Sequence, residues 1–267
     1  MVAWPIVCQP KSIGGLGLHN LKLLNAALRA KWIWTAKTEG ERSWAGLDVH
    51  VTQLARDIFD ASTVATVGVG DKILFWEDPW IGGLSASCVA PAVLAMVRPG
   101  ITRKLTVQEG LADHAWVRSI AGVLSVDATV QFFKLWEAVH GVLPTAGVDS
   151  FRWKWTADGA FSARTAYLAF FAGKTILPGA AQLWNSFAPL RFKVFGWLAL
   201  RRRCWSADRM ARHGLESHVT CPLCGIADET LDHLLLQCHF ARAIWYRFLQ
   251  RRGWDALAPT PASELSD

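Results

Sequence analysis

The spacing of apolar residues predicts that much of the chain is helical. In residues 20–34, large apolar side chains recur every three or four positions, the period of an amphipathic helix; they are Leu21, Leu24, Leu28 and Trp32. Asn20 stands directly before this pattern and is predicted to cap the helix by accepting hydrogen bonds from its first free N–H groups. Just upstream, Gly14, Gly15 and Gly17 predict a turn, since the Gly-Lys-Ser/Thr of a phosphate loop does not follow.

Further helices are predicted along the chain. Short ones are expected around 106–121 and 127–140, and another from about Ser162, its predicted N-cap, to Ala172. The apolar run RFKVFGWLALRRRCW at 191–205 predicts a helix that ends in three consecutive arginines.

Two segments instead predict β-hairpins. In residues 64–80 a valine-rich stretch precedes a Gly70-Asp71 turn, and the apolar run ILFW follows it. In residues 151–163 aromatic residues alternate with basic ones before an Asp158-Gly159 turn. The predicted fold is therefore α+β, mainly helical, with small β-hairpins and a C-terminal zinc-binding module.

Turn-forming residues divide the chain into predicted parts. Gly173, Pro178 and Gly179 mark a linker. The expected division is a helical segment at 1–60, an α+β region with both hairpins at 61–172, the linker at 173–183, a basic zinc-binding module at 184–252 and a disordered tail at 253–267.

Composition predicts a folded chain that works inside the cell. Of 267 residues, 52% are hydrophobic and 19% charged, which allows a real core, and most of the 15 tryptophans are expected to anchor it. The first residues, MVAWPIVCQP, lack the basic and apolar regions of a secretory signal. No apolar run approaches the roughly 18 residues that span a bilayer. A nuclear or cytoplasmic location without membrane contact follows, where clustered cysteines favour a metal over disulfides.

The candidate chemistry lies in CPLCGIADETLDHLLLQCHF. Its spacing, Cys221-x2-Cys224-x8-His233-x4-Cys238, offers three thiols and an imidazole, which is a closed ligand set for structural zinc. Gly225 suits the tight turn of a zinc knuckle.

The helix predicted after Cys224 sets a geometric condition on this site. Asp228 is expected to cap it near Glu229. His233 and Cys238 are five residues apart, which is about 140° around an ideal helix. Both can reach one ion only if the helix loosens or ends near Gln237.

Three other interpretations of these residues remain open. Cys221 and Cys224 could form a redox pair, although that leaves His233 and Cys238 unexplained. All four could be plain buried residues. A different ligand could also replace one of them, since His239 follows Cys238, and three more candidates lie upstream: Cys204, His213 and His218.

The net charge of +6 is concentrated around this candidate site. Residues 184–252 hold 11 basic and 5 acidic residues, whereas the remainder holds 17 of each. A localised basic surface favours polyanions such as nucleic acids. The predicted contacts are Arg191, Lys193, Arg201, Arg202, Arg203, Arg209, Arg212, Arg242, Arg247, Arg251 and Arg252, with Trp205 or His239 available for stacking.

Several segments together resemble the zinc-binding region that follows the reverse transcriptase of plant LINE-type (non-LTR) retrotransposons. They are CQPKSIGGLGLHNLKLLNAALRAKWIW at 8–34, GVGDKILFWEDPW at 68–80, Asp149 with WKWTADGAFSARTAY at 153–167, Trp184 with PLRFKVFGWLALRRR at 189–203, and CPLCGIADETLDHLLLQCHFARAIW at 221–245. The resemblance implies that the zinc ligands are Cys221, Cys224, His233 and Cys238. It also implies a segment located after the polymerase that helps to hold template RNA or target DNA.

These observations lead to competing hypotheses of function. The first is a non-catalytic, zinc-dependent module that binds RNA or DNA. The second is a structural module that docks on a protein, such as the polymerase, through Ile244, Trp245, Phe248 and Leu249.

An enzyme is the third hypothesis, and the sequence argues against it. The aromatic-x-Asp-Asp signature of polymerases, whose carboxylates bind Mg²⁺, is missing from this sequence. Asp228, Glu229 and Asp232 lie near His233, but helix capping and support of a metal-bound imidazole explain them more simply than acid–base chemistry. No catalytic residue is therefore predicted.

Overall fold

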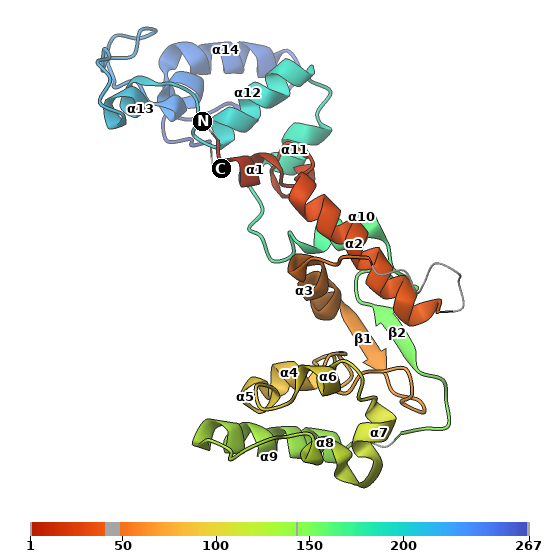
Figure 1. The fold of residues 1–267 in the computed structure, drawn as a ribbon. Helices are drawn as coiled ribbons and strands as arrows, with labels where there is room; N and C mark the ends of the chain where they lie inside the picture. The colour runs from red at the N-terminus through yellow and green to blue at the C-terminus, as the bar shows by residue number, and fades with distance from the viewer. Residues whose placement is uncertain (1, 41–48, 143, 266–267) are drawn as a thin grey trace. The chain divides into compact units, whose positions relative to one another are not determined.

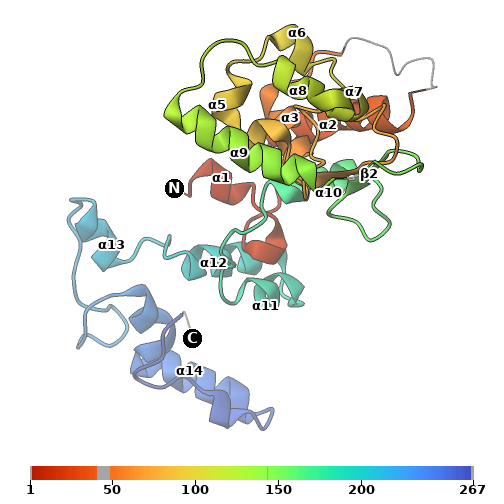
Figure 2. The ribbon, with the colours of Figure 1, turned by 90° about the horizontal axis from the view of Figure 1, so that it is seen from below.

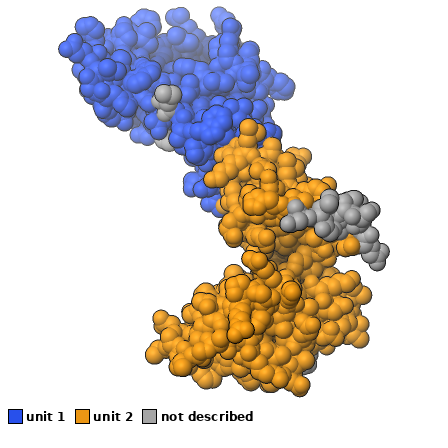
Figure 3. Space-filling model, viewed as in Figure 1, with its two compact units in different colours: residues 1–19, 173–267 blue, residues 20–172 orange. Residues whose placement is uncertain are grey.

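The computed structural model describes residues 2–40, 49–142 and 144–265. About half of the chain is helical, and the described residues form one small antiparallel sheet. The chain divides into two compact units (Figure 3): residues 1–19 with 173–267, here called the terminal unit, and residues 20–172, here called the central unit. Residues 1–60, predicted as one segment, are thus shared between the units, and part of them, 41–48, lies outside the described residues. Which parts of the chain fold alone stays a prediction.

The central unit begins with helix α2 (Leu21–Thr38). The predicted cap is confirmed, because the Asn20 side chain accepts hydrogen bonds from the backbone N–H groups of Lys22 and Leu23 at 3.1 and 3.4 Å. Small residues form the buried face of this helix, toward α3 (Gln53–Ser62) and α10 (Ala163–Ala169); they are Ala26, Ala27, Ala30 and Thr35. The larger apolar residues Leu21, Leu28 and Trp32 are exposed.

The sheet joins segments that are far apart in the sequence. Strand β1 (Thr63–Thr66) pairs antiparallel with β2 (Ser150–Trp153), with Thr63 opposite Trp153 (Figure 1). The two local hairpins predicted at 64–80 and 151–163 are therefore wrong in their pairing, although the small antiparallel content is confirmed.

Competing backbone bonds explain the difference from the predicted hairpins. The backbone after Gly70 forms hydrogen bonds with residues 105–107 instead of with residues 64–69. The Phe75 N–H donates to the Leu105 carbonyl, and the Val107 N–H donates to the Ile73 carbonyl. The second turn does form, since Trp153 N–H donates to the Gly159 carbonyl at 2.7 Å, but no strand follows it.

Short helices around an aromatic core complete the central unit. They are α4 (Ala86–Val89), α5 (Pro91–Leu94), α6 (Pro99–Thr102), α7 (Val107–Leu111), α8 (Ala115–Arg118) and α9 (Val126–His140). Helix α9 runs alongside α5 (Figures 1 and 2). Phe75, Trp76 and Trp116 are fully buried, and the rings of Phe75 and Trp116 stack at 5.7 Å. The helix predicted at 106–121 is divided, because Asp113 and His114 adopt positive φ between α7 and α8.

The terminal unit brings the first residues of the chain onto its C-terminal part. Its helices are α1 (Trp4–Val7), α11 (Ala180–Asn185), α12 (Leu190–Leu200), α13 (Ala207–Arg212) and α14 (His239–Gln250). Trp197 Nε1 and Arg201 Nη2, at the end of α12, donate to the Gly14 carbonyl at 2.8 and 2.7 Å.

The final residues make specific contacts within the same unit. A 3-10 turn covers Asp255–Leu257. Gln237 Nε2 donates to the Ser263 carbonyl, and Arg242 Nε donates to the Pro259 carbonyl. The stretch 253–265, predicted as part of a disordered tail, is thus tied to the helices before it.

Two expectations from composition bear on the whole chain. Tryptophans anchor the core at Trp76, Trp116 and Trp153, but others, among them Trp155 and Trp254, are exposed. Among the helices of the described residues, none has the length and apolarity to cross a bilayer.

Candidate metal centre

Four predicted ligands meet in the terminal unit. The sulfurs of Cys221, Cys224 and Cys238 and a ring nitrogen of His233 all lie within 4.8 Å of one another. Cys224 Sγ is 3.3 Å from His233 Nε2. Cys221 and Cys238 are buried, while the other two are partly exposed. Four ligands at zinc–ligand distances of about 2.0–2.3 Å stand roughly 3.5–4 Å apart, so this cluster has the dimensions of a tetrahedral site.

A tight turn positions the first two cysteines. Gly225 N–H donates to the Cys221 carbonyl at 2.8 Å, and Gly225 has φ 65°, a conformation that favours glycine. Backbone N–H groups of Ala227 and Ile226 point at the Cys224 sulfur and lower its pKa to about 6, with help from His233. Cys224 therefore favours the thiolate, the form that binds metal, at neutral pH.

The first cysteine of this turn, Cys221, has the opposite tendency. Burial raises the pKa of the Cys221 thiol above its ordinary value, and hydrogen bonds from the backbone of Cys224 and Leu223 oppose this only in part. A metal bound here would displace that proton, because thiolate is the ligand.

A loosened helix brings the other two ligands together. Residues His233–Gln237 form a π-helical turn, closed by a 2.7 Å hydrogen bond from Cys238 N–H to the His233 carbonyl. In a π-turn residues five apart stand nearly above one another, because the backbone bond joins i to i+5. The geometric condition set by the sequence is thus met.

The predicted cap at Asp228 is wrong. Asp228 forms an isolated bridge with Thr220. The His233 N–H donates instead to Thr230 Oγ1 at 3.1 Å, because the helix begins later than predicted and Thr230 lies three residues before His233. Thr230 was missed, although a threonine three residues ahead of a helical position is itself a capping signal.

The alternative ligands lie outside the cluster. His239 is exposed and its ring lies against Phe240. His213 is exposed and faces Trp205. All six cysteines are free thiols.

Neighbouring carboxylates have structural partners. Glu229 Oε1 accepts the Ala207 N–H at 3.0 Å and so caps α13. Asp232 forms an ion pair with Arg202 and also accepts the Leu265 N–H at 2.9 Å. Glu229 thus caps a helix other than the one predicted to begin beside it, and Asp232 has an ion-pair partner.

The predicted nucleic-acid contacts are of three kinds. The exposed ones are Arg191, Arg202, Arg203, Arg212, Arg247, Arg251 and Arg252. Lys193, Arg201 and Arg242 are partly buried and donate to backbone carbonyls. Arg209 is only 5% exposed, so it is part of the interior.

Apolar residues alternate with the arginines on α14. Phe240, Ile244 and Phe248 follow one another at intervals of four and are 53%, 66% and 52% exposed. They therefore form one apolar stripe on the helix surface. Trp245 is 41% exposed and Leu249 is partly buried.

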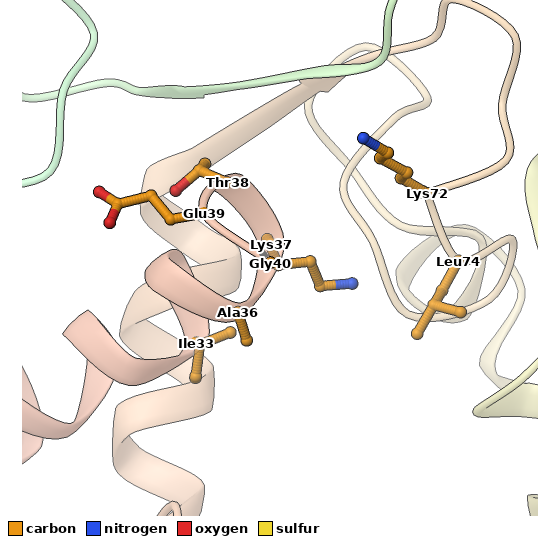
Figure 4. A pocket seen from close by; sticks show the side chains of 8 residues that line it. All are labelled: Ile33, Ala36, Lys37, Thr38, Glu39, Gly40, Lys72 and Leu74. Carbon is orange, nitrogen blue, oxygen red and sulfur yellow. The ribbon is translucent and has the colours of Figure 1, made fainter. Parts of the chain in front are cut away.

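The central unit has a cavity of its own, of about 770 Å³. Figure 4 shows Lys37 reaching from α2 toward the loop that carries Lys72 and Leu74, while Glu39 points away. Lys37 forms an ion pair with Asp78, so its charge is already neutralised. Because the cavity lies beside residue 40, where the described chain is interrupted, we assign it no ligand.

The cluster is of the Cys₃His type that zinc-binding modules use, with three thiols and one imidazole on a knuckle and a helix. Residues 161–245 match the family described as zinc-binding in reverse transcriptase, and all four cluster residues fall in that range. The match covers less than half of the chain, so it shows a similarity of this segment to that family.

A longer relative matches nearly the whole chain. It is a protein of Arabidopsis thaliana named "Putative ribonuclease H protein", 26% identical over 94% of this chain. The chain spans 44% of that relative's length. No solved structure has significant similarity to the chain.

Proposed function

We propose that residues 184–252 form a zinc-stabilised, non-catalytic module that binds RNA or DNA. This module would be part of a reverse transcriptase polyprotein of retrotransposon origin. Cys221, Cys224, His233 and Cys238 would hold the ion. Four protein ligands leave no open position for water or substrate, so zinc would stabilise the fold rather than catalyse. Such a module would act in the nucleus or the cytoplasm, where nucleic acid is present.

One observation carries this proposal: the metal cluster adjoins a helix with exposed arginines and aromatics. Helix α14 begins at His239, directly after the ligand Cys238. Arg247, Arg251 and Arg252 are exposed on or just beyond it, and the Arg252 guanidinium lies 4.2 Å from the Phe248 ring centre. Arginines pair with phosphates, and exposed aromatic rings stack on bases without regard to sequence.

The experiment is retention of single-stranded RNA by the zinc-loaded chain over a salt series. Retention at low salt should fall steeply as salt rises, because phosphate contacts release counterions. Arg247→Gln with Arg251→Gln should weaken binding and flatten the salt slope. The matched control is Arg103→Gln with Arg118→Gln, two exposed arginines of the central unit. Absence of retention at low salt would contradict the proposal.

The exposed stripe on α14 favours a second candidate function. Phe240, Ile244 and Phe248 could bury against a protein, such as the polymerase domain, instead of stacking on bases. Ile244→Ser distinguishes protein docking from base stacking, since isoleucine has no ring that could stack on a base. Loss of polymerase binding with unchanged RNA retention would favour docking.

A further inference from the structure

One arginine of the terminal unit is buried without a counter-charge. Arg209, on α13, is 5% exposed. Its Nη1 donates to the Arg202 carbonyl at 2.5 Å, and its Nε is buried without a hydrogen-bond partner. Among the described residues no carboxylate forms an ion pair with it. Its guanidinium also lies 5.0 Å from the centre of the Trp205 ring. A buried cation without a counter-charge is nevertheless unfavourable, so this side chain calls for an explanation.

Arg209 lines a cavity of about 310 Å³. The wall also includes Arg202 and Arg212, together with Cys204, Ser206 and the turn Thr230–Asp232. Two carboxylates are present as well, but both are already neutralised. Asp208 pairs with Arg212, and Asp232 pairs with Arg202. The charge that neither carboxylate pairs with belongs to Arg209, which makes the cavity suited to an anion.

The backbone around the cavity is held in an unusual conformation. Arg202 follows the C-terminus of α12 with φ 54°, in the left-handed region where glycine is the usual residue. In this conformation the Arg202 carbonyl accepts a hydrogen bond from Arg209, while the Arg202 guanidinium forms an ion pair with Asp232. Backbone strain of this kind persists where its surroundings enforce it, and it gathers at ligand sites.

We propose that this cavity binds a phosphate group, with the Arg209 guanidinium as its main donor. The planar fork of an arginine matches two oxygens of one phosphate, and a desolvated site strengthens the charge-assisted bonds. The phosphate can come from a nucleic-acid backbone or from free inorganic phosphate. The nucleic-acid source rests on the proposed function, whereas the anion site itself does not.

The cavity is coupled to the metal centre through short contacts. Thr230, in its wall, accepts the N–H of the ligand His233. Glu229 caps α13, the helix that carries Arg209. A metal that fixes His233 therefore also fixes one wall of the cavity, so phosphate binding should require the metal-loaded protein.

Cys204 offers a direct readout, because its thiol lines the same cavity. We would use the zinc-loaded full chain with Cys88→Ser, which removes an exposed thiol of the central unit. Alkylation of Cys204 by iodoacetamide is followed by peptide mass spectrometry at pH 8.5, since burial raises the pKa of this thiol. Inorganic phosphate should slow alkylation several-fold and saturably, while chloride at equal ionic strength should not. Equal effects of phosphate and chloride would overturn the proposal.

Variants test the role of the guanidinium fork. Arg209→Lys keeps the charge but loses the fork, and should abolish protection by phosphate. Arg103→Lys is the matched control, because Arg103 is exposed in the central unit and is not part of the wall. Cobalt substitution checks that each variant keeps the thiolate absorption of the metal centre. If Arg209→Lys loses this absorption, the variant is set aside. The proposal then stands or falls on whether phosphate protects Cys204 saturably in the chain with Arg209 intact.

A second arm identifies the source of the phosphate. A single-stranded oligonucleotide with ordinary phosphodiesters is compared with one whose linkages are uncharged methylphosphonates. Protection of Cys204 by the first alone supports a nucleic-acid phosphate in the cavity. Protection by inorganic phosphate alone supports the anion site without that source. RNA retention in the salt series tests the proposed function separately. If the protein retains RNA while Cys204 stays unprotected, only the proposed phosphate site in the cavity is refuted.

Discussion

The two units bury their apolar residues in different ways. The central unit has a continuous aromatic core, in which Phe75, Trp76 and Trp116 are fully buried together with Leu135 of α9. In the terminal unit, the buried cluster around the ligands contains Cys221, Cys238 and Ala241, with Cys224 and Leu234 packed against it. Many of its larger apolar residues are exposed, among them Phe187 and Ile244.

This difference separates two sources of stability. Burial of large rings removes enough apolar surface from water to stabilise the central unit, most of whose helices are too short to persist alone. A cluster of cysteines and alanine buries far less surface, so the bonds to the proposed metal ion would take a larger part. The comparison therefore predicts that the same treatment affects the two units unequally.

Metal removal should produce the largest effect. Cys221→Ser, or a strong chelator, should disorder the segment 184–252 and leave the central unit, including 151–172, largely ordered. The loss is expected to be on the order of 10 kcal/mol, the contribution of structural zinc in small modules. Hydrogen exchange, read peptide by peptide, measures both regions in one experiment.

The matched control for this prediction is Cys88→Ser. Cys88 is an exposed thiol of the central unit, so its replacement should leave hydrogen exchange unchanged in both units. If chelated and zinc-loaded protein exchange equally in 184–252, the metal has no structural role there and the comparison fails.

A core substitution should show the reverse pattern with a smaller effect. Trp116 packs against Phe75, Trp76 and Phe132. Trp116→Ala should destabilise the central unit by about 3–5 kcal/mol, as removal of a large buried ring does, while zinc affinity stays the same. Urea-dependent hydrogen exchange of the central peptides and a zinc titration measure the two effects.

An exposed tryptophan gives the control here. Trp155 is 44% exposed in the same unit, so Trp155→Ala should cost only about 0.5 kcal/mol, as surface changes do. A comparable loss in both variants would show that the aromatic core is not what stabilises this unit.

Local signals in the sequence predicted the parts of the fold that depend on neighbours in the chain. The spacing from Cys221 to Cys238 identified the cluster, because a knuckle and one helical turn are short-range structures. Asn20 identified the start of α2, since a cap acts within three residues. Even the loosened turn at His233 followed from spacing, because two ligands five apart cannot share an ion on an ideal helix.

Features that depend on distant parts of the chain were not predictable in this way. Strand β1 pairs with β2 rather than with its neighbour, and nothing within 64–80 encodes that choice. Arg209 looks like any surface arginine of a basic segment, yet its burial depends on Arg202 and on the cavity wall. The exposed Leu28 and Trp32 likewise show that an apolar stripe does not by itself specify the buried face; the smaller alanines allow closer helix packing.

Asp149 links the sheet to the aromatic core and should give the smallest of the three effects. Its carboxylate accepts backbone N–H groups of Gly68 and Gly70 at 2.8 Å and of Lys72 at 2.9 Å. Burial alone would raise the pKa of Asp149, but these hydrogen bonds outweigh it and lower the pKa below its ordinary value. Asp149→Asn removes the charge and one accepting oxygen, so the central unit should lose about 2–3 kcal/mol near neutral pH.

The sign of the pH dependence follows from that lowered pKa. A carboxyl group whose pKa is lower in the folded state stabilises the fold above its unfolded pKa of about 4, and that contribution disappears as pH falls through the folded pKa. The difference between wild type and Asp149→Asn should thus be full at pH 7 and shrink below about pH 4. Asp158→Asn is the control, since that exposed carboxylate accepts one backbone N–H, from Ala160, and should lose less. A pH-independent difference would mean that Asp149 acts through its shape, and the charged link between sheet and core would have to be abandoned.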